Sequence, residues 1–516
     1  MSNEVQTAEP NNLRELLEER VQVNPEKHFL FSEADGRSYT YASFDAAVNR
    51  AVRLLAAHGV GKGDVVSLLM PNSAEYIIAY FACFKMGALA GPINSLLKPP
   101  EMAYVINNSE AKALLVNSEF LPQIESIMDE LPSLDAVIEF DDEREASGNF
   151  SGEREHLPVA TLERDDEAII IYTSGTTGKP KGCLLTHGNL MANARQIKEW
   201  LGFTEKDRLL TMMPLFHMNA VSVTTLTPLY AGASTVVSPK FSATRFWQII
   251  SDYEITSFGS VATMLTMLLE KYPRGVPEGL KTEQLRFAMC GSAPVPAEVL
   301  KRFEETFNCL VIEGYGLSES TCRSTFNPPD ERRRPGSCGM PIGNEMRVVD
   351  EEEREVSDGE LGEIVLRGEN ILKGYYKNAE ANERAFRGGW FHTGDVGYRD
   401  ADGFYYIVDR KSDMIIRGGE NIYPREIDET LYEHGAVAAA ATIGIPDKLY
   451  GEEVTAFVVL KNGETATEDE LLNHCRARLA DFKCPKTIHI IDEIPKGPTG
   501  KLLKRELAKQ FSARRK

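Results

Sequence analysis

The sequence predicts an α/β fold, with a large N-terminal domain of layered sheets and helices and a small C-terminal α+β domain. At 516 residues, the chain exceeds the roughly 250–300 residues at which a single core usually divides. Helical and strand-like patterns alternate from Leu13 to about Val159 and again beyond residue 182, as in α/β proteins. Short strands separated by glycine follow Asp350, and the pattern changes again at Asp409. We therefore predict domains at 1–409 and 410–516.

The spacing of apolar residues predicts the individual elements. Helices are expected at 41–58, 74–86 and 243–253. Strands are expected at 64–69, 234–237, 286–290, 362–366, 403–408, 437–445 and 454–460. Thr467 and Glu470 form a capping-box pattern, so another helix is expected to begin there.

Composition narrows the class of protein. The chain is 42% apolar and 26% charged, which is typical of a globular protein. Its net charge of −20 argues against nucleic acid as a partner, because duplex binding depends on clustered lysine and arginine. The eight cysteines are scattered without a CxxC pair, which fits a reducing cytoplasm better than a disulfide framework or a zinc site. The most apolar window, 76–89, contains Lys85 and is too short for a transmembrane segment.

The most informative segment is YTSGTTGKPKG, from Tyr172 to Gly182, which follows the apolar run 169–172. Backbone N–H groups and hydroxyls of such a loop can surround a polyphosphate while lysine supplies charge. The residues expected to bind nucleotide are Thr173, Ser174, Gly175, Thr176, Thr177, Gly178 and Lys179. The spacing differs from a Walker A loop, which has four residues before its Gly-Lys pair and Ser or Thr after it. A glycine-rich surface turn is the alternative for a segment of this kind taken alone.

This segment resembles the signature loop of the adenylate-forming, or AMP-binding, superfamily. That superfamily includes acyl-CoA synthetases, firefly-type luciferases and the adenylation domains of peptide synthetases. Segments that resemble its later motifs follow in the same order, so the resemblance covers most of the chain. It implies a carboxylic acid–CoA ligase that uses ATP and Mg²⁺ to form an acyl-adenylate with release of pyrophosphate. The acyl group then passes to coenzyme A with release of AMP.

Two further segments resemble motifs that bind the nucleotide and the metal. In EGYGLSE, 313–319, the resemblance implies that the tyrosine packs on adenine, the serine meets phosphate and the last glutamate holds Mg²⁺. The residues concerned are Glu313, Gly314, Tyr315, Gly316, Ser318 and Glu319. Ser318 stands where many members have threonine, and it keeps the hydroxyl. Asp395 in GWFHTGD and Arg410 in YYIVDR resemble residues that bind the ribose. Without the resemblance, a turn explains the first segment equally well and a surface ion pair explains Arg410.

The C-terminal part resembles the mobile small domain of this family. Lys501, in PKGPTGK, resembles the catalytic lysine that bridges the substrate carboxylate and the α-phosphate. The resemblance puts the hinge at Ser412, where relatives often carry Asp or Lys. Gly418 and Gly419 resemble the loop that leaves room for the pantetheine arm of CoA. A β-turn between two strands is the alternative for that pair of glycines.

The resemblance puts the acid pocket at residues 214–219, 258–263 and 291–294. It implies that His217 has a catalytic role in gating the carboxylate, and that Met218, Phe258 and Gly291 line the pocket. Gly291, Ser292 and Ala293 are also expected to contact nucleotide. Arg323 either faces a second carboxylate of the substrate or forms a surface ion pair, and the ion pair is the commoner role. Segments near His217, 332–335 and 417–421 also resemble crotonobetaine/carnitine-CoA ligases, although no aromatic cage for a quaternary ammonium is evident.

Two other functions stay open at this point. One is an adenylating enzyme that passes the acyl group to a carrier protein or an amine. The other is a nucleotide-binding module without turnover, against which the presence of Lys501, Glu319 and Asp395 argues. The sequence fixes neither the acid, which could come from fatty acid metabolism, nor the oligomeric state, for which a homodimer is one option.

Overall fold

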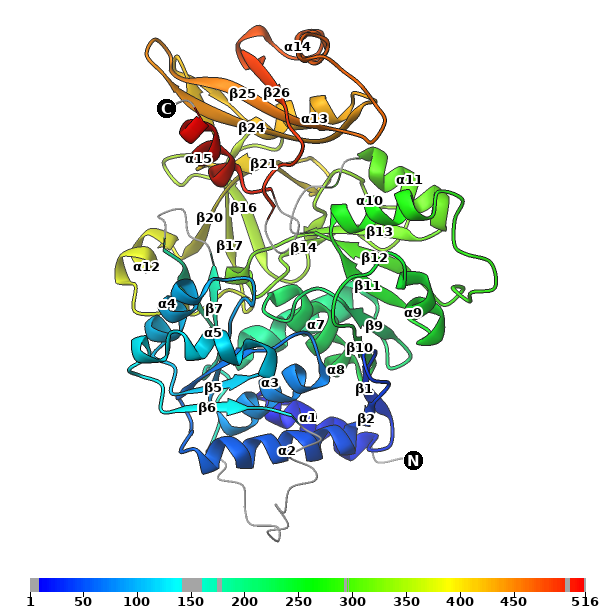
Figure 1. Ribbon diagram of the computed structural model, residues 1–516, viewed down its shortest axis with the longest axis vertical. Coiled ribbons are helices and arrows are strands. Elements are labelled where there is room, and N and C mark those ends of the chain that lie inside the picture. The colour runs from blue at the N-terminus through cyan, green and yellow to red at the C-terminus, as the bar shows by residue number, and fades with distance from the viewer. Residues whose placement is uncertain are drawn as a thin grey trace.

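The computed structural model of the protein describes residues 9–141, 160–173, 179–291, 295, 297–496 and 502–514. Within these ranges the strands form four sheets, three before Lys411 and one after it. The C-terminal sheet lies at one end of the molecule, and helix α2 (Tyr41–Ala57) lies at the other (Figure 1). The predicted α/β fold with a large N-terminal and a small C-terminal part is confirmed.

Two large sheets form most of the molecule. Most of their inner strands are parallel and buried on both faces, which explains their continuous apolar sequences. The nine-stranded sheet has the order β15 (Met340–Pro341), β14 (Thr325–Phe326), β13 (Leu310–Tyr315), β12 (Phe287–Cys290), β11 (Ser257–Ser260), β9 (Arg208–Thr211), β10 (Ser234–Val237), β1 (His28–Ser32) and β2 (Ser38–Thr40). The seven-stranded sheet has the order β18 (Gly374–Tyr375), β8 (Lys181–Thr186), β7 (Glu167–Thr173), β4 (Leu89–Pro92), β3 (Val65–Leu69), β5 (Ala113–Val116) and β6 (Ala136–Glu139).

A third sheet is antiparallel and connects the large part to the C-terminal part. Its strands are β16 (Glu345–Val349), β17 (Gly362–Arg367), β20 (Trp390–Arg399) and β19 (Phe386–Arg387), with β21 (Tyr405–Arg410) beside β20. Strand β21 ends at Arg410, and the first strand of the C-terminal sheet begins at Ile415. Residues on β20 and β21 are therefore held next to both parts of the molecule.

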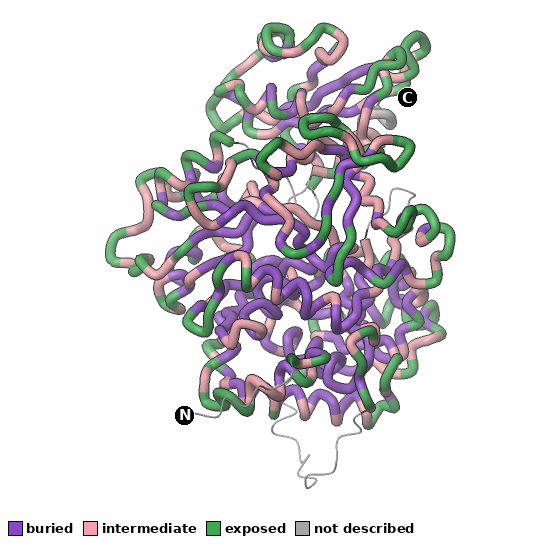
Figure 2. Tube along the Cα trace, turned by 180° about the vertical axis from the view of Figure 1, so that it is seen from behind, coloured by how far each residue is buried: buried purple, intermediate pink, exposed green. Residues whose placement is uncertain are grey.

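Helices cover the sheets of the large part. They are α1 (Leu13–Val23), α2, α3 (Ala74–Met86), α4 (Pro99–Ser109), α5 (Leu121–Glu125), α7 (His187–Leu201), α8 (Thr227–Ala231), α9 (Phe246–Asp252), α10 (Ala262–Lys271), α11 (Ala297–Phe307) and α12 (Ala379–Ala385). Helix α3 is buried on nearly every side, and its one basic residue, Lys85, is paired with Asp45 at 2.5 Å. Figure 2 shows this buried interior, with exposed residues gathered on the outer loops. Among the described helices, none combines the length and apolar composition that a membrane span requires.

The C-terminal part has a sheet and an apolar core of its own. The sheet has the order β23 (Glu420–Ile422), β22 (Ile415–Arg417), β25 (Gly451–Leu460) and β24 (Val437–Asp447), with β26 (Thr487–Ile490) beside β25. Helices α13 (Pro424–Tyr432), α14 (Glu468–Arg476) and α15 (Lys504–Arg514) pack on it. Its buried apolar residues, from Ile415 onward, form clusters separate from those of the large part. The boundary between 409 and 410 stays a prediction.

Local capping chemistry explains where the elements begin and end. The backbone N–H of Glu470 donates to Thr467 Oγ1, and Glu470 accepts from the N–H of Thr467, so the capping box that starts α14 is confirmed. Helix α9 is shorter than the predicted 243–253. Its first turn is replaced by a β-turn, because the N–H of Arg245 donates to the carbonyl of Ser242.

Candidate active site

The predicted phosphate loop is the connection of the β7–β8 hairpin. Thr173 at the end of β7 pairs with Lys181 at the start of β8. Lys179 is exposed, and its Nζ lies 5.4 Å from the ring centroid of Tyr104. Lys181 Nζ lies 4.9 Å from the ring centroid of Tyr375. The other expected phosphate-binding residues of this loop lie outside the described residues: Ser174, Gly175, Thr176, Thr177 and Gly178.

Glu319 lies beside that hairpin. Tyr375 donates its hydroxyl hydrogen to Glu319 Oε1 at 3.1 Å, and Thr173 Oγ1 lies 3.5 Å from the same oxygen. Glu319 stands in the short helical turn Ser318–Ser320, directly after β13. The structure thus brings together two motifs that lie about 140 residues apart in sequence. Tyr375 was missed, since an isolated tyrosine on a two-residue strand carries no pattern that sequence reasoning can detect.

Tyr315, Asp395 and Arg410 form a second cluster. The Tyr315 hydroxyl donates to Asp395 Oδ2 at 2.6 Å, and Arg410 Nε lies 3.2 Å from Asp395 Oδ1. Asp395 and Arg410 are direct partners across β20 and β21, which fixes their spacing. Burial and the nearby Asp395 carboxylate raise the pKa of Tyr315 well above its usual value, so this hydroxyl stays protonated. All three were expected in the nucleotide site, and the structure puts them in contact.

Glu313 and the two glycines around Tyr315 are constrained by close packing. Burial raises the pKa of Glu313 to about 7, and the N–H of Gly336 donates to Glu313 Oε2 at 2.9 Å. A Cβ at Gly316 would lie 2.0 Å from the carbonyl oxygen of Cys322, so only glycine fits this position. A Cβ at Gly314 would lie 2.6 Å from the Thr325 carbonyl oxygen. The segment after β13 is therefore pressed against the chain that returns from Cys322.

The predicted acid-pocket residues divide into two groups. His217 and Asn219 present buried polar atoms, His217 Nε2 and Asn219 Oδ1, that have no hydrogen-bond partner in the described part of the chain. Burial lowers the pKa of His217 to about 4, so its imidazole is neutral at pH 7. Met218 and Phe258 are buried, and the Phe258 ring packs edge-on against Phe246 of α9, in the core.

An unusual helix begins at Asn219, one of the two polar residues of the predicted acid pocket. Asn219 begins a π-helical segment, Asn219–Leu226, a conformation that is rare and often occurs at functional sites. Asn219 Oδ1 lies over Gly259 of β11, since a Cβ at that glycine would be 2.7 Å away. The side chain therefore sits against the carboxyl end of a parallel strand, where α/β proteins bind ligands.

Gly291 and Arg323 meet at the end of the next strand, β12. A Cβ at Gly291 would lie 2.0 Å from Arg323 Nη1, so glycine is required beneath the guanidinium. Arg323 is only 2% exposed, and no ion pair holds it among the described residues. The expectation that a surface ion pair is its commoner role is therefore wrong here. Ser292 and Ala293 lie outside the described residues.

The expected hinge residue lies just before the C-terminal sheet, and the expected CoA-binding residues lie in the hairpin of β22 and β23. Ser412 is exposed in the turn between β21 and β22, where its hydroxyl donates to Asp413 at 3.0 Å. Gly418 and Gly419 form the two-residue turn of the β22–β23 hairpin, with φ values of 61° and 93°. Both need the left-handed conformation that glycine adopts freely. The two glycines therefore form a β-turn between two strands, which was the alternative to a CoA-binding loop. This turn is also exposed on the surface.

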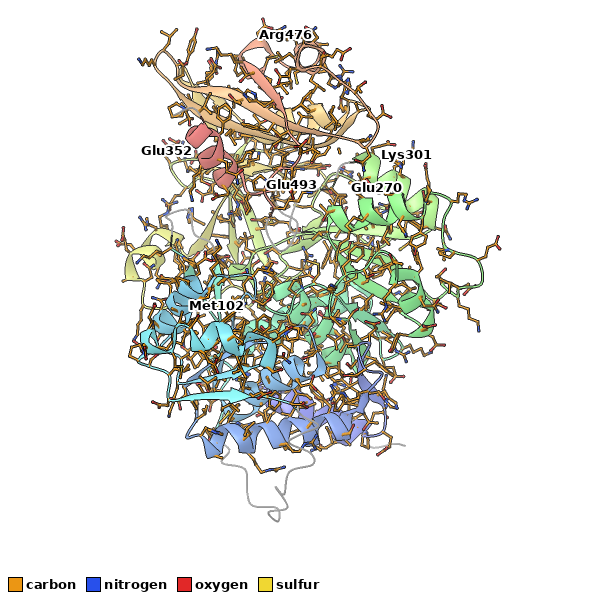
Figure 3. The ribbon with its side chains drawn as sticks, in the orientation of Figure 1. Met102, Glu270, Lys301, Glu352, Arg476 and Glu493 are labelled. Atoms are coloured by element: carbon orange, nitrogen blue, oxygen red, sulfur yellow. The ribbon has the colours of Figure 1, made fainter. Side chains whose placement is uncertain are left out.

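Lys501 lies outside the described residues. The chain that leads to it passes between the two parts of the molecule, where Figure 3 shows Glu493 below the C-terminal sheet. The N–H of Leu503 donates to the carbonyl oxygen of Pro495 at 2.8 Å, so the described residues on either side of 497–501 are hydrogen-bonded to each other. Helix α15 is tied back to the small domain by Lys504, whose Nζ lies 2.8 Å from Asp428 Oδ2.

Two other observations concern reactive and metal-binding groups. Cys183, next to the hairpin loop, is fully buried, and burial raises the pKa of its thiol well above the usual value. Both properties favour a packing role for Cys183 over a nucleophilic one. In the part of the chain that the structure describes, no group of three or more His, Cys, Asp or Glu side chains could hold a metal ion by itself.

The chain is similar to known proteins over nearly its whole length. The family model of AMP-binding enzymes matches residues 17–376, and that of the AMP-binding enzyme C-terminal domain matches residues 426–501. A sulfoacetate–CoA ligase of Cupriavidus necator is 35% identical over 503 residues, which cover 96% of this chain and 97% of the relative. A long-chain-fatty-acid–CoA ligase of Mycobacterium tuberculosis is 34% identical over 505 residues, covering 97% and 99%.

Solved structures agree with this relationship. The anthranilate CoA ligase AuaEII, solved in complex with anthranoyl-AMP, superposes with a TM-score of 0.89 at 32% identity and covers 98% of this chain and 99% of its own. The resemblance to adenylate-forming enzymes is confirmed by sequence and by structure. The chain therefore belongs to the AMP-binding enzyme family and carries that family's C-terminal domain.

Proposed function

We propose that this protein is an AMP-forming carboxylate–CoA ligase. In the first half-reaction, a carboxylate oxygen of the acid attacks the α-phosphorus of ATP, the bond to the β-phosphate oxygen breaks and pyrophosphate leaves. In the second, the thiol sulfur of CoA attacks the acyl carbon and loses its proton. AMP then leaves with the oxygen that came from the acid. The relatives named as CoA ligases support CoA as the acceptor.

The cluster of Tyr315, Asp395 and Arg410 carries the proposal. A buried carboxylate that accepts from a tyrosine hydroxyl and is paired with an arginine is well suited to accept from the two ribose hydroxyls of ATP. The hairpin at Thr173 and Lys181 would lie against the phosphates, with Ser318 at its side. Binding by fixed groups aligns the α-phosphorus with the attacking acid and removes much of the entropic barrier.

Mg²⁺ fits the residues at Glu319. This ion is usually held by one or two carboxylates together with substrate phosphates, and Glu319 lies beside the phosphate hairpin without an ion-pair partner in the described chain. Bound there, Mg²⁺ would neutralise charge on the phosphates. Lys501 is proposed to stabilise charge between the acid and the α-phosphate. His217 is proposed to position the carboxylate as a neutral imidazole.

The small domain is proposed to serve the second half-reaction. Rotation about Ser412 would bring the Gly418–Gly419 turn toward the acyl-adenylate and open a path for pantetheine. An enzyme that transfers the acyl group to a carrier protein or an amine would catalyse the same first half-reaction. The identity of the acceptor therefore distinguishes such an enzyme from a CoA ligase. The acid itself is not given by the relatives, whose names include a two-carbon sulfonated acid and long-chain fatty acids.

The test is release of pyrophosphate and AMP from MgATP over a panel of acids, each with and without CoA. The proposal predicts that AMP release requires CoA and is matched by an equal amount of thioester. Pyrophosphate release that does not depend on CoA would indicate that the enzyme transfers the acyl group to another acceptor. Absence of pyrophosphate with every acid would favour a nucleotide-binding module without turnover.

A further inference from the structure

Arg323 is a buried cation, and none of the described residues gives it an acidic partner. Its Nη1 donates to the carbonyl oxygen of Gly314 at 3.1 Å, and its Cζ lies 5.1 Å from the ring centroid of Phe326. Within the described residues, Nε and Nη2 have no hydrogen-bond partner. The guanidinium therefore has an edge with two N–H directions free, although the residue is 2% exposed.

Such a group is costly unless a ligand completes it. Buried charges in proteins are normally paired, because removing a cation from water is not repaid by one carbonyl and one aromatic ring. The fork of a guanidinium matches a carboxylate or another oxyanion through two parallel hydrogen bonds. An anion brought by a ligand is the partner that this edge lacks.

The position of Arg323 links it to the acid pocket. Its guanidinium covers Gly291, since a Cβ there would lie 2.0 Å from Nη1 and 2.8 Å from Nη2. Gly291 follows β12, and Gly314 precedes the nucleotide-site residue Tyr315 on β13. Both lie at the carboxyl ends of neighbouring parallel strands, the edge at which α/β sheets bind ligands.

Polar groups continue along this edge. Asn219 Oδ1 lies over Gly259 of β11, the strand next to β12, and it also lacks a partner in the described chain. Neighbouring strands are about 4.8 Å apart, so these side chains lie near one another. His217 Nε2, two residues before Asn219, is a third buried atom without a partner. A second anionic group would accept from the free N–H groups of Arg323, and from His217 Nε2 in the tautomer that carries its proton there, whereas an apolar acid would leave these donors unsatisfied. Asn219 Oδ1 only accepts, so it needs a hydrogen-bond donor instead.

The backbone of Arg323 is held rigidly. Asn193 Nδ2 donates to the Arg323 carbonyl at 2.7 Å, and Asn370 Nδ2 donates to the same oxygen at 3.2 Å. The turn just before it contains Thr321 at φ 66° and ψ −42°, a strained conformation for threonine. Strain maintained by such contacts is typical of a segment that fixes a side chain for binding.

We propose that Arg323 binds a second anionic group of the acid, and that the substrates are short dianionic acids such as dicarboxylates. This inference rests on the proposed ligase function and names its substrate class. One carboxylate reacts at the α-phosphorus, and the other acid group pairs with Nε and Nη2 of Arg323. The chain between them must be short, because the guanidinium contacts Gly314, the residue next to Tyr315.

The experiment compares acids that differ only in the second charge. Rates of pyrophosphate release in the presence of CoA are measured with malonate against malonamate and with succinate against succinamate, and acetate, butyrate and octanoate are included. The enzymes are the wild type, Arg323→Met, Arg323→Lys and the control Arg332→Met. Arg332 is exposed and paired only with Asp330 in the described chain. Thermal unfolding and ATP binding verify that each variant is folded.

The wild type is expected to prefer the dianion of at least one pair by about 10²-fold in kcat/KM, since the loss of one partner of a buried charge pair costs on the order of 10²-fold. Arg323→Met should lose this preference, Arg323→Lys should keep part of it, and Arg332→Met should match the wild type. Preference for the amides or apolar acids, or equal loss on both members of a pair in Arg323→Met, would overturn the role of Arg323 and leave the ligase function intact. If Arg323→Met does not fold, the role of Arg323 is tested by the wild-type preference for the dianion and by its partial loss in Arg323→Lys. No pyrophosphate with any acid would refute the ligase function, and this inference with it.

Discussion

Asp395 and Arg410 face each other across strands β20 and β21, and Arg410 Nε lies 3.2 Å from Asp395 Oδ1. The second oxygen of the same carboxylate accepts from Tyr315, at the end of β13. One buried carboxylate thus connects the nine-stranded sheet to the sheet that leads into the small domain. Nucleotide bound at this carboxylate would touch both.

Asp395→Asn is expected to raise the KM for ATP about 10- to 100-fold. The amide keeps the shape but loses the charge, and hydrogen bonds to a charged group are worth about 1.5–3 kcal/mol. Initial rates at varied ATP check this. Asp402→Asn is the matched control, because Asp402 is exposed in the loop that joins β20 to β21. An unchanged KM for ATP in Asp395→Asn would show that Asp395 does not bind the ribose hydroxyls.

Glu319→Gln is expected to lower the rate of adenylation about 10²-fold and to shift its Mg²⁺ dependence to higher concentration. The reason is that a neutral amide is a poorer ligand for a hard cation than a carboxylate. Tyr375→Phe removes only one hydrogen bond to Glu319, about 1 kcal/mol, and should cost about fivefold. Mg²⁺ titrations of the three enzymes check this order, and identical titration curves would contradict it.

Lys501→Ala is expected to reduce adenylation about 10²- to 10³-fold, the usual cost of losing a group that stabilises transition-state charge. Thioester formation from a supplied acyl-adenylate should stay within a few fold of the wild type. Lys496→Ala serves as the control, since Lys496 is exposed five residues earlier in the same segment. Equal loss of both steps in Lys501→Ala would refute the separation of roles.

Gly419→Leu is expected to block thioester formation while leaving adenylation largely unchanged, the opposite of the effect expected for Lys501→Ala. Gly463 offers a matched control in the same domain: its φ is 83° against 93° for Gly419, and an added Cβ meets nothing within 4 Å at either position. Both leucines therefore carry the same backbone strain, roughly 1–2 kcal/mol. If Gly463→Leu impairs thioester formation as much, strain rather than obstruction of the CoA path is the cause.

Glu313→Gln is expected to stabilise the protein above neutral pH. Burial raises the pKa of this carboxyl from 4.5 to about 7, so between these values the folded state binds more protons than the unfolded state. Stability from this group therefore falls as pH rises through that window, by roughly 3 kcal/mol. Thermal unfolding of both proteins from pH 4.5 to 8 checks this. Parallel curves would show that Glu313 has an ordinary pKa.

Much of the fold follows from local sequence. Helix α3 has the predicted bounds, because Ser73 caps its start and Gly87, with φ 84°, ends it. Strand β10 also has its predicted bounds. Helix α9 was predicted too long, since the apolar spacing continues through a turn that only the backbone hydrogen bond at Ser242 reveals.

The candidate site is predictable only in part. Motifs identified the segments of Tyr315, Asp395 and Arg410, but their mutual contacts depend on strand register. Arg323 was misjudged because arginine is usually exposed, and its burial results from the turn at Thr321 and the glycine at 291. Tyr375 reaches Glu319 through sheet pairing between β18 and β8. Contacts of this kind depend on tertiary packing.

The central claim is that an acid is activated as its adenylate and then transferred to CoA. The most direct measurement is to supply the acid with ¹⁸O in its carboxylate, together with MgATP and CoA, and to examine AMP and pyrophosphate by mass spectrometry. The account predicts one ¹⁸O atom in AMP for each thioester formed and none in pyrophosphate. Label in inorganic phosphate with formation of ADP, or thioester without label in AMP, would contradict it.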